Sequence, residues 1–142
     1  MLFIALPIIV EFDNVNYKLN YIAFVGVLIF GFGLLFESIG DWQLFCFKKN
    51  KNNKGKIITS GLWRFIRHPN YFGEAVLWWG IGVFTLSSEL WYAAIISPII
   101  LNLLLLYVSG VPLLEKKYAG NADWEEYKKV TPAFLPFFGK KG

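Results

Sequence analysis

The sequence contains few residues that bind metals or form covalent cross-links. Of its 142 residues, only Cys46 is a cysteine and only His68 is a histidine. One cysteine excludes a disulfide within the chain, and one cysteine with one histidine provides too few ligands for a zinc-type site. We therefore expect no bound metal.

Charged residues are also scarce, whereas apolar residues are abundant. Hydrophobic residues make up 56% of the sequence, above the roughly 45–50% apolar share of soluble domains. The excess indicates a protein that lies in the lipid bilayer. Because one crossing needs about 20 apolar residues, the chain has room for three or four crossings. No second globular domain fits, so we expect one membrane domain over residues 1–142.

The first apolar runs differ in length. Residues 1–10 are too few to cross a membrane and resemble the end of a helix that begins outside this chain, so we expect the C-terminal part of a longer protein. A second run, residues 21–47, is long enough for a span. It contains small positions that allow another helix to approach closely: Gly26, Gly31, Gly33 and Gly40.

Two further spans are predicted at residues 69–86 and 90–114, joined by a turn at residues 87–89. Pro98 is expected to kink the last span. The tail that follows is amphipathic, with Trp124 and Tyr127 as expected interfacial anchors. In the alternative interpretation, Glu115, Trp124 and Tyr127 dock the tail on the bundle. The predicted fold is an all-α, multi-pass transmembrane helical bundle with an amphipathic C-terminal tail.

The basic residues predict the orientation of this bundle. Apart from Lys18, every lysine and arginine lies in the connection at residues 48–67 or after residue 114. The positive-inside rule therefore places this connection and the C-terminal tail in the cytosol. The same rule explains the net charge of +4 without nucleic-acid binding.

A polar cluster, GLWRFIRHPNYFGE at residues 61–74, stands at the cytosolic start of the span at residues 69–86. Pro69 is favoured at the first position of a helix, which makes His68 the expected N-cap. Free backbone N–H groups there, together with Arg64 and Arg67, suit a phosphate or carboxylate. We expect an anionic cofactor at this point.

Two groups of side chains could extend this site. Asn70, Tyr71 and Glu74 occupy neighbouring positions on one helix face. Glu37 and Asp41 share a face of the preceding span, and a carboxylate within a membrane is a functional candidate. The alternative interpretation makes the arginines topology signals, His68 a helix cap, Tyr71 an interfacial residue and the two acids a helix end wetted by headgroups.

These residues also resemble a known family. RHPNYFGE at residues 67–74, with ESIGDWQL at 37–44 and SGVPLLE at 109–115, resembles the steroid 5α-reductase-like membrane enzymes, in particular their DUF1295 subgroup, over about residues 30–137. The RHP-x-Y-type motif and the C-terminal ending are also similar to those of the isoprenylcysteine carboxyl methyltransferases. The reductases bind NADPH, and these methyltransferases bind S-adenosylmethionine.

The resemblance implies a membrane oxidoreductase that transfers hydride from NADPH to a carbon–carbon double bond of a hydrophobic, sterol-like or isoprenoid lipid. Arg67, His68, Asn70 and Arg64 would hold the cofactor. Tyr71 and Glu74 would position the nicotinamide or relay a proton, since hydride addition requires a general acid.

Two other functions stay open. In a methyltransferase that uses S-adenosylmethionine, Glu37 and Asp41 could hold the cofactor's ammonium group. Family reductases are usually longer than this chain, and their first helices help form the cavity for the lipid substrate. A non-catalytic membrane protein that retains the pocket is the third hypothesis.

Overall fold

The computed structural model describes residues 20–87 and 91–135. These residues form helices, turns and loops with no strand, which confirms the all-α class. Our expectations about residues 1–10 and about the turn at residues 88–89 lie outside the described residues.

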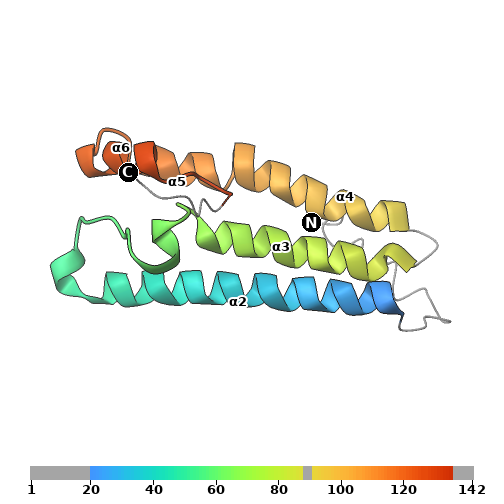
Figure 1. Ribbon diagram of the computed structural model, residues 1–142. Coiled ribbons are helices and arrows are strands. Elements are labelled where there is room, and N and C mark those ends of the chain that lie inside the picture. Colours follow the sequence, from blue (N-terminus) through green and yellow to red (C-terminus); the bar gives the residue numbers. More distant parts are fainter. Residues whose placement is uncertain (1–19, 88–90, 136–142) are drawn as a thin grey trace.

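The longest element is α2 (Tyr21–Lys49), a helix of 29 residues that extends about 43 Å at 1.5 Å per residue. It begins at Asn20, whose side chain accepts a hydrogen bond of 2.9 Å from the backbone nitrogen of Ala23. Lys48 and Lys49 occupy its last turn, where positive charge is favourable beside the exposed carbonyl groups. α2 therefore runs the length of the molecule (Figure 1).

Glycines bring α2 against the antiparallel helix α3 (Pro69–Phe84) at backbone contact. Gly26 and Gly33 are buried in this contact. A Cβ at Gly26 would lie 2.5 Å from the backbone nitrogen of Phe84, and one at Gly33 would overlap the backbone nitrogen of Leu77. The prediction that small residues on α2 admit another helix is thus confirmed for these two positions.

Gly40 and Gly31, the other two glycines named from the sequence, differ in what surrounds them. Gly40 lies against the start of α3, where a Cβ would be 3.2 Å from the backbone nitrogen of Asn70. At Gly31 a Cβ would meet no described atom within 4 Å. Gly31 therefore lies on a different side of α2 from the contact with α3, and its predicted role in a close helix contact stays a prediction.

α3 lies between α2 and α4 (Trp91–Leu103) (Figure 1). Pro98 is inside α4 and packs against Gly82, where a Cβ would lie 3.3 Å from the proline ring. The interruption of the predicted span comes later, at a π-helical turn (Leu104–Val108) that is followed by Gly110 and α5 (Val111–Lys117). The described residues of the predicted span at 90–114 therefore do not form one continuous α-helix.

The chain after α5 folds back on the bundle. A turn leads to α6 (Ala122–Val130), whose N-cap Asn121 accepts a hydrogen bond of 3.1 Å from the backbone nitrogen of Trp124. Trp124 and Tyr127 are only 4% and 6% exposed. They pack inside the protein, so our prediction that they anchor the tail at the lipid interface is wrong.

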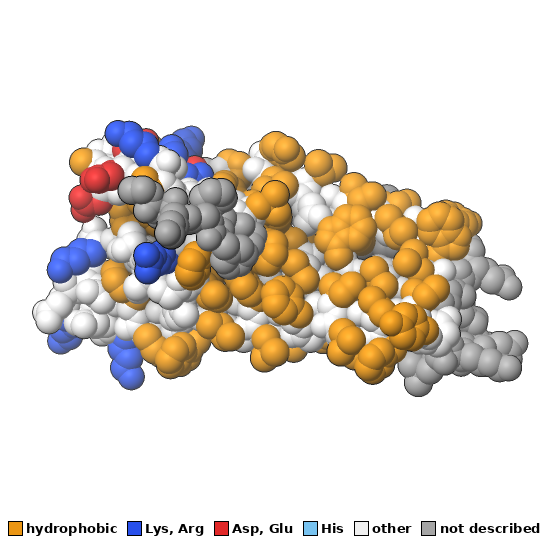
Figure 2. All heavy atoms as spheres, viewed as in Figure 1, with side chains coloured by type: hydrophobic (Ala, Val, Ile, Leu, Met, Phe, Trp, Pro, Cys, Tyr) orange, Lys and Arg blue, Asp and Glu red, His pale blue; other side chains and the backbone are white. Residues whose placement is uncertain are grey.

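The surface divides into an apolar part and a charged end. Figure 2 shows hydrophobic side chains along the helices, with the lysine, arginine and acidic side chains gathered at the end that carries α6. Two helical segments are long and apolar enough to cross a membrane: α2 (Tyr21–Lys49), and Ile95–Lys117, which joins most of α4, the π-helical turn and α5. Only 17% and 33% of their most apolar windows are buried within the protein, whereas the core helix of a soluble protein is mostly buried. With 16 residues, α3 spans about 24 Å.

Candidate cofactor site

A cavity of about 620 Å³ opens at the charged end of the molecule, between the end of α2, the loop that follows it, α5 and α6. This volume lies within the range of about 300–1,000 Å³ typical of small-molecule and cofactor sites. Its lining combines basic and aromatic side chains. The basic ones are Lys48, Lys51, Lys54, Lys56, Arg67 and His68, and the aromatic ones are Phe47, Trp63, Tyr118, Trp124 and Tyr127.

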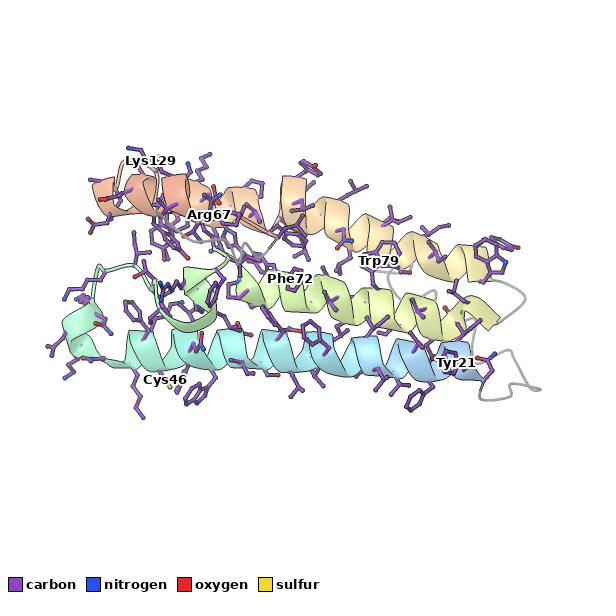
Figure 3. The ribbon with its side chains drawn as sticks, in the orientation of Figure 1. Tyr21, Cys46, Arg67, Phe72, Trp79 and Lys129 are labelled. Carbon is purple, nitrogen blue, oxygen red and sulfur yellow. The ribbon has the colours of Figure 1, made fainter. Side chains whose placement is uncertain are left out.

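Arg67 and His68 form the wall where α3 begins. Arg67 Nη2 lies 2.8 Å from Glu115 Oε1, and His68 Nε2 lies 3.2 Å from the same oxygen. Arg67 Nη1 also donates to the backbone carbonyl of Lys128 at 3.2 Å. Figure 3 shows Arg67 between the start of α3 and the C-terminal helices. These contacts hold α5, α6 and the start of α3 together.

Burial determines the protonation of His68, which is 2% exposed. Desolvation lowers its pKa below the ordinary 6.5, although the hydrogen bond and charge of Glu115 act in the opposite direction. The imidazole is therefore neutral at physiological pH. His68 is also the N-cap of α3, with Pro69 in the first turn, as predicted.

The aromatic wall is formed where α6 docks. The rings of Tyr118 and Trp124 stack with centroids 4.9 Å apart, and Trp124 contacts Tyr127 at 5.6 Å. Burial raises the pKa of Tyr127 above its ordinary value of 10, so its hydroxyl stays protonated and donates to the backbone carbonyl of Trp63. Trp63 Nε1 donates to the carbonyl of Gly40 at 3.2 Å, which ties this wall to α2.

Three cavity residues carry a buried nitrogen atom that lacks a hydrogen-bond partner among the described residues: Arg67 Nε, His68 Nδ1 and Trp124 Nε1. Buried polar atoms are nearly always paired in native structures. Their concentration around one cavity fits a site that takes a polar ligand.

The other residues selected from the sequence lie outside this cavity. Arg64 lines a separate cavity of about 270 Å³ together with Asp123 and Glu126. Asn70 packs against α2 at Gly40, with its side-chain oxygen buried and unpaired in the described structure. The sequence cluster is therefore divided between two cavities and a helix contact.

The acidic and phenolic candidates form a second group on α2 and α3. Glu37 and Asp41 on α2 are within electrostatic range of Glu74 on α3. Tyr71 is within range of both Glu74 and Asp41, and its ring stacks on His68 with centroids 5.6 Å apart. His68 therefore connects this group to the cavity.

Sequence reasoning missed most of the lining. The lysines at residues 48–56 were interpreted only as topology signals, and Trp124 and Tyr127 as membrane anchors or as residues that dock the tail, but not as part of a cofactor site. The sequence signal that could have found them is a lysine run and an aromatic-rich tail, each next to a span end on the same side of the bundle. Only the folding back of α6 brings them together.

Comparison with known proteins gives relatives of two kinds. A probable O-methyltransferase, ustE, of Ustilaginoidea virens is 39% identical over 67 residues, which are 47% of this chain and 23% of that protein. A methanethiol S-methyltransferase of Crocosphaera subtropica is 26% identical over 140 residues, covering 92% of this chain and 52% of that protein. The steroid 5-alpha-reductase DET2 of Gossypium hirsutum is 37% identical over 76 residues, covering 53% and 30%.

The chain thus spans about half or less of the length of these curated relatives. No solved structure matches it. A reductase and methyltransferases both occur among the relatives, which agrees with the two resemblances found in the sequence. The family model described as "Protein of unknown function (DUF1295)" matches residues 1–131, extending further toward the N-terminus than the expected residue 30. The chain therefore belongs to the DUF1295 family, and its relatives include a steroid 5-alpha-reductase and methyltransferases.

Proposed function

We propose that this protein is a multi-pass membrane reductase that binds NADPH in the cavity at its charged end and reduces a carbon–carbon double bond of a hydrophobic lipid. The observation that carries the proposal is the lining of that cavity. It combines four lysines with several aromatic rings, and none of the described residues that line it is acidic.

The charge of the cavity supports a dinucleotide. NADPH carries a pyrophosphate and a 2′-phosphate, so it requires several positive groups distributed along an elongated site. S-adenosylmethionine carries one carboxylate beside two positive groups. A wall with Lys48, Lys51, Lys54 and Lys56 suits the first better than the second, because lysine binds phosphate as a mobile point charge.

The remaining lining residues suit the rest of such a cofactor. The half-buried ring of Tyr118, which Trp124 supports from one side, offers a stacking surface for a base. Arg67 and His68 line the same cavity, and His68 Nδ1 lacks a hydrogen-bond partner among the described residues. Arg67 and His68 thus remain proposed cofactor residues, whereas the support for Arg64 and Asn70 is weaker because neither lines this cavity.

When bound, NADPH supplies a hydride, and the carbon chemistry then requires a proton from an acid. Tyr71 and Glu74 remain our proposed proton relay, because Tyr71 stacks on His68 and Glu74, also on α3, is within electrostatic range of Tyr71. Glu37 and Asp41 would modulate that relay through their electrostatic contact with Glu74. Their carboxylates also lie away from the cavity, which weakens the assignment of Glu37 and Asp41 as cofactor ligands.

The proposed membrane position follows from the apolar surface. α2 exposes large apolar side chains such as Phe24, Leu28 and Leu35, and the charged end carries the loop at residues 48–56 and α6 (Figure 2). We infer that this end faces the cytosol, where NADPH is available, and that the lipid substrate reaches the protein from the bilayer.

The test is cofactor binding by the full-length protein in detergent or nanodiscs, measured by isothermal titration with NADPH and with S-adenosylmethionine. We expect saturable binding of NADPH. Consumption of reduced nicotinamide in the presence of α,β-unsaturated sterol and isoprenoid ketones would then identify the substrate class. Binding of S-adenosylmethionine with no detectable NADPH binding would reject the reductase.

A methyltransferase is the second candidate, and the comparisons favour it specifically. The methanethiol S-methyltransferase relative aligns with 92% of this chain, further than the steroid reductase relative does. In this case the cavity would receive the methionine carboxylate of S-adenosylmethionine. Binding of neither cofactor would favour the third possibility, a membrane protein without catalytic activity.

A further inference from the structure

One wall of the cavity carries positive charge that no ion pair among the described residues neutralises. Lys48, Lys51, Lys54 and Lys56 all line it. Within the described residues, the ion pairs involve Arg67 and Lys128, and none involves these four lysines. Four like charges on one wall repel one another, and a bound anion would relieve that repulsion.

Asparagine side chains fix the loop that carries these lysines. Asn53 Nδ2 donates to the carbonyl of Phe47 in the last turn of α2 at 3.0 Å. Asn50 Oδ1 accepts from the backbone nitrogen of Asn52 at 3.0 Å. Backbone hydrogen bonds from Lys54 to Lys51 and from Lys56 to Asn53, at 3.2 and 3.0 Å, add further turns. The loop backbone is therefore ordered before any ligand binds.

The positive charge of Arg67, in contrast, is already paired within the protein. Its guanidinium is paired with Glu115 at 2.8 Å and hydrogen-bonded to the carbonyl of Lys128. Its side chain is only 10% exposed. A ligand with several phosphate charges would therefore depend on the lysines for most of its neutralisation.

We propose that the lysine loop, defined as residues 48–56, binds the phosphate monoester that distinguishes NADPH from NADH, with Lys51, Lys54 and Lys56 as the selectivity residues. The inference rests on the proposed function. A phosphate monoester carries about −1.5 to −2 charges at neutral pH, more than one phosphate of a pyrophosphate. A wall with several uncompensated lysines therefore favours the cofactor that has the additional monoester.

The test compares two triple variants with the same change of net charge. In the cavity variant, Lys51→Gln, Lys54→Gln and Lys56→Gln remove three lining lysines. In the control variant, Lys49→Gln, Lys116→Gln and Lys117→Gln remove three exposed lysines that do not line the cavity. Dissociation constants for NADPH and NADH are measured for both variants and for the unmodified protein, each checked for an unchanged thermal transition.

We expect the unmodified protein to prefer NADPH. The cavity variant should lose NADPH affinity by roughly tenfold or more, since each charge-assisted contact contributes at least that factor. Its affinity for NADH should change much less. The selectivity ratio, which is the dissociation constant for NADH divided by that for NADPH, should therefore decrease. The control variant should keep the ratio of the unmodified protein.

An unchanged ratio in the cavity variant, with NADPH still bound, would overturn this inference and leave the proposed function intact. If the unmodified protein bound neither dinucleotide, the proposed function and this inference would both be rejected. Vesicles containing phosphatidylserine test a lipid headgroup as the source of phosphate. Loss of vesicle binding in the cavity variant, without any change in selectivity, would assign the lysines to lipid and also overturn the inference.

Discussion

Glu115 accepts a charge-assisted contact of 2.8 Å from Arg67, 48 positions earlier in the chain. The same carboxylate oxygen lies 3.2 Å from His68 Nε2. One side chain of α5 thus secures two residues at the start of α3. Because Arg67 also binds the carbonyl of Lys128, it positions the tail that closes the cavity, whatever it contributes to a cofactor.

We predict that Glu115→Gln and Arg67→Ala each destabilise the docked tail. The two side chains are 19% and 10% exposed, and removing one partner of a largely buried pair costs about 3–5 kcal/mol. Unfolding in mixed detergent micelles measures the loss. Trypsin cleavage after Lys128 and Lys129 should become faster, because α6 would separate more often from the bundle.

The matched control for this pair is Glu125→Gln. Glu125 lies 3.5 Å from Lys128 on the exposed face of α6, and such surface pairs contribute about 0–1 kcal/mol. Equal effects of Glu115→Gln and Glu125→Gln would show that the Arg67 contact does not hold the tail.

The burial of His68 predicts a dependence of stability on pH. Because desolvation lowers its pKa in the folded protein below 6.5, the unfolded chain binds a proton that the folded protein does not bind. The contribution of neutral His68 to the free energy of unfolding is complete above about pH 6.5. It is lost as the pH falls toward the lower pKa of His68 in the folded protein. The thermal transition temperature should therefore decrease as the pH is lowered from about 7 to about 5.

Replacing His68 with glutamine should remove this part of the pH dependence while leaving the contribution of the carboxylates. Identical slopes for the unmodified protein and His68→Gln would mean that His68 is not the group that titrates.

The helix contact predicts that Gly33→Ala is destabilising, since a Cβ at this position would overlap the backbone of α3 at Leu77. Forcing extra volume into a close-packed contact costs about 1–3 kcal/mol. Gly31→Ala, two residues away, meets no described atom within 4 Å and should stabilise the protein by about 0.5–1 kcal/mol, because glycine inside a helix loses more conformational freedom on folding than alanine. Similar thermal transitions for the two variants would contradict the observed register of α2 and α3.

The proposed orientation predicts which end of the bundle a membrane-impermeant thiol reagent reaches from the cytosol. Cys46 is exposed, so it is first replaced by serine. In that background we expect Lys54→Cys to react from the cytosolic side and Tyr21→Cys, at the opposite end of α2 (Figure 3), to react from the other side. The reverse pattern would invert the topology and place the cavity outside the cytosol.

The sequence determined the features that depend on local chemistry. Apolar runs predicted helices close to where α2, α3 and α4 form, and Pro69 predicted the helix start at His68. Small residues indicated a close helix contact, which Gly26 and Gly33 make. The family resemblance was likewise readable, because it depends on motifs in chain order.

Only the tertiary structure decided which of these residues share a cavity. Arg64 and Arg67 are three positions apart yet line different cavities, because Arg64 belongs to a 3-10 turn (Gly61–Arg64) that ends before α3 begins. Trp124 and Tyr127 have the composition of membrane anchors, but α6 turns them inward beside the lysine loop. Sequence periodicity reports which face of its own helix a residue occupies, whereas the docking of α6 depends on contacts between residues more than 40 positions apart.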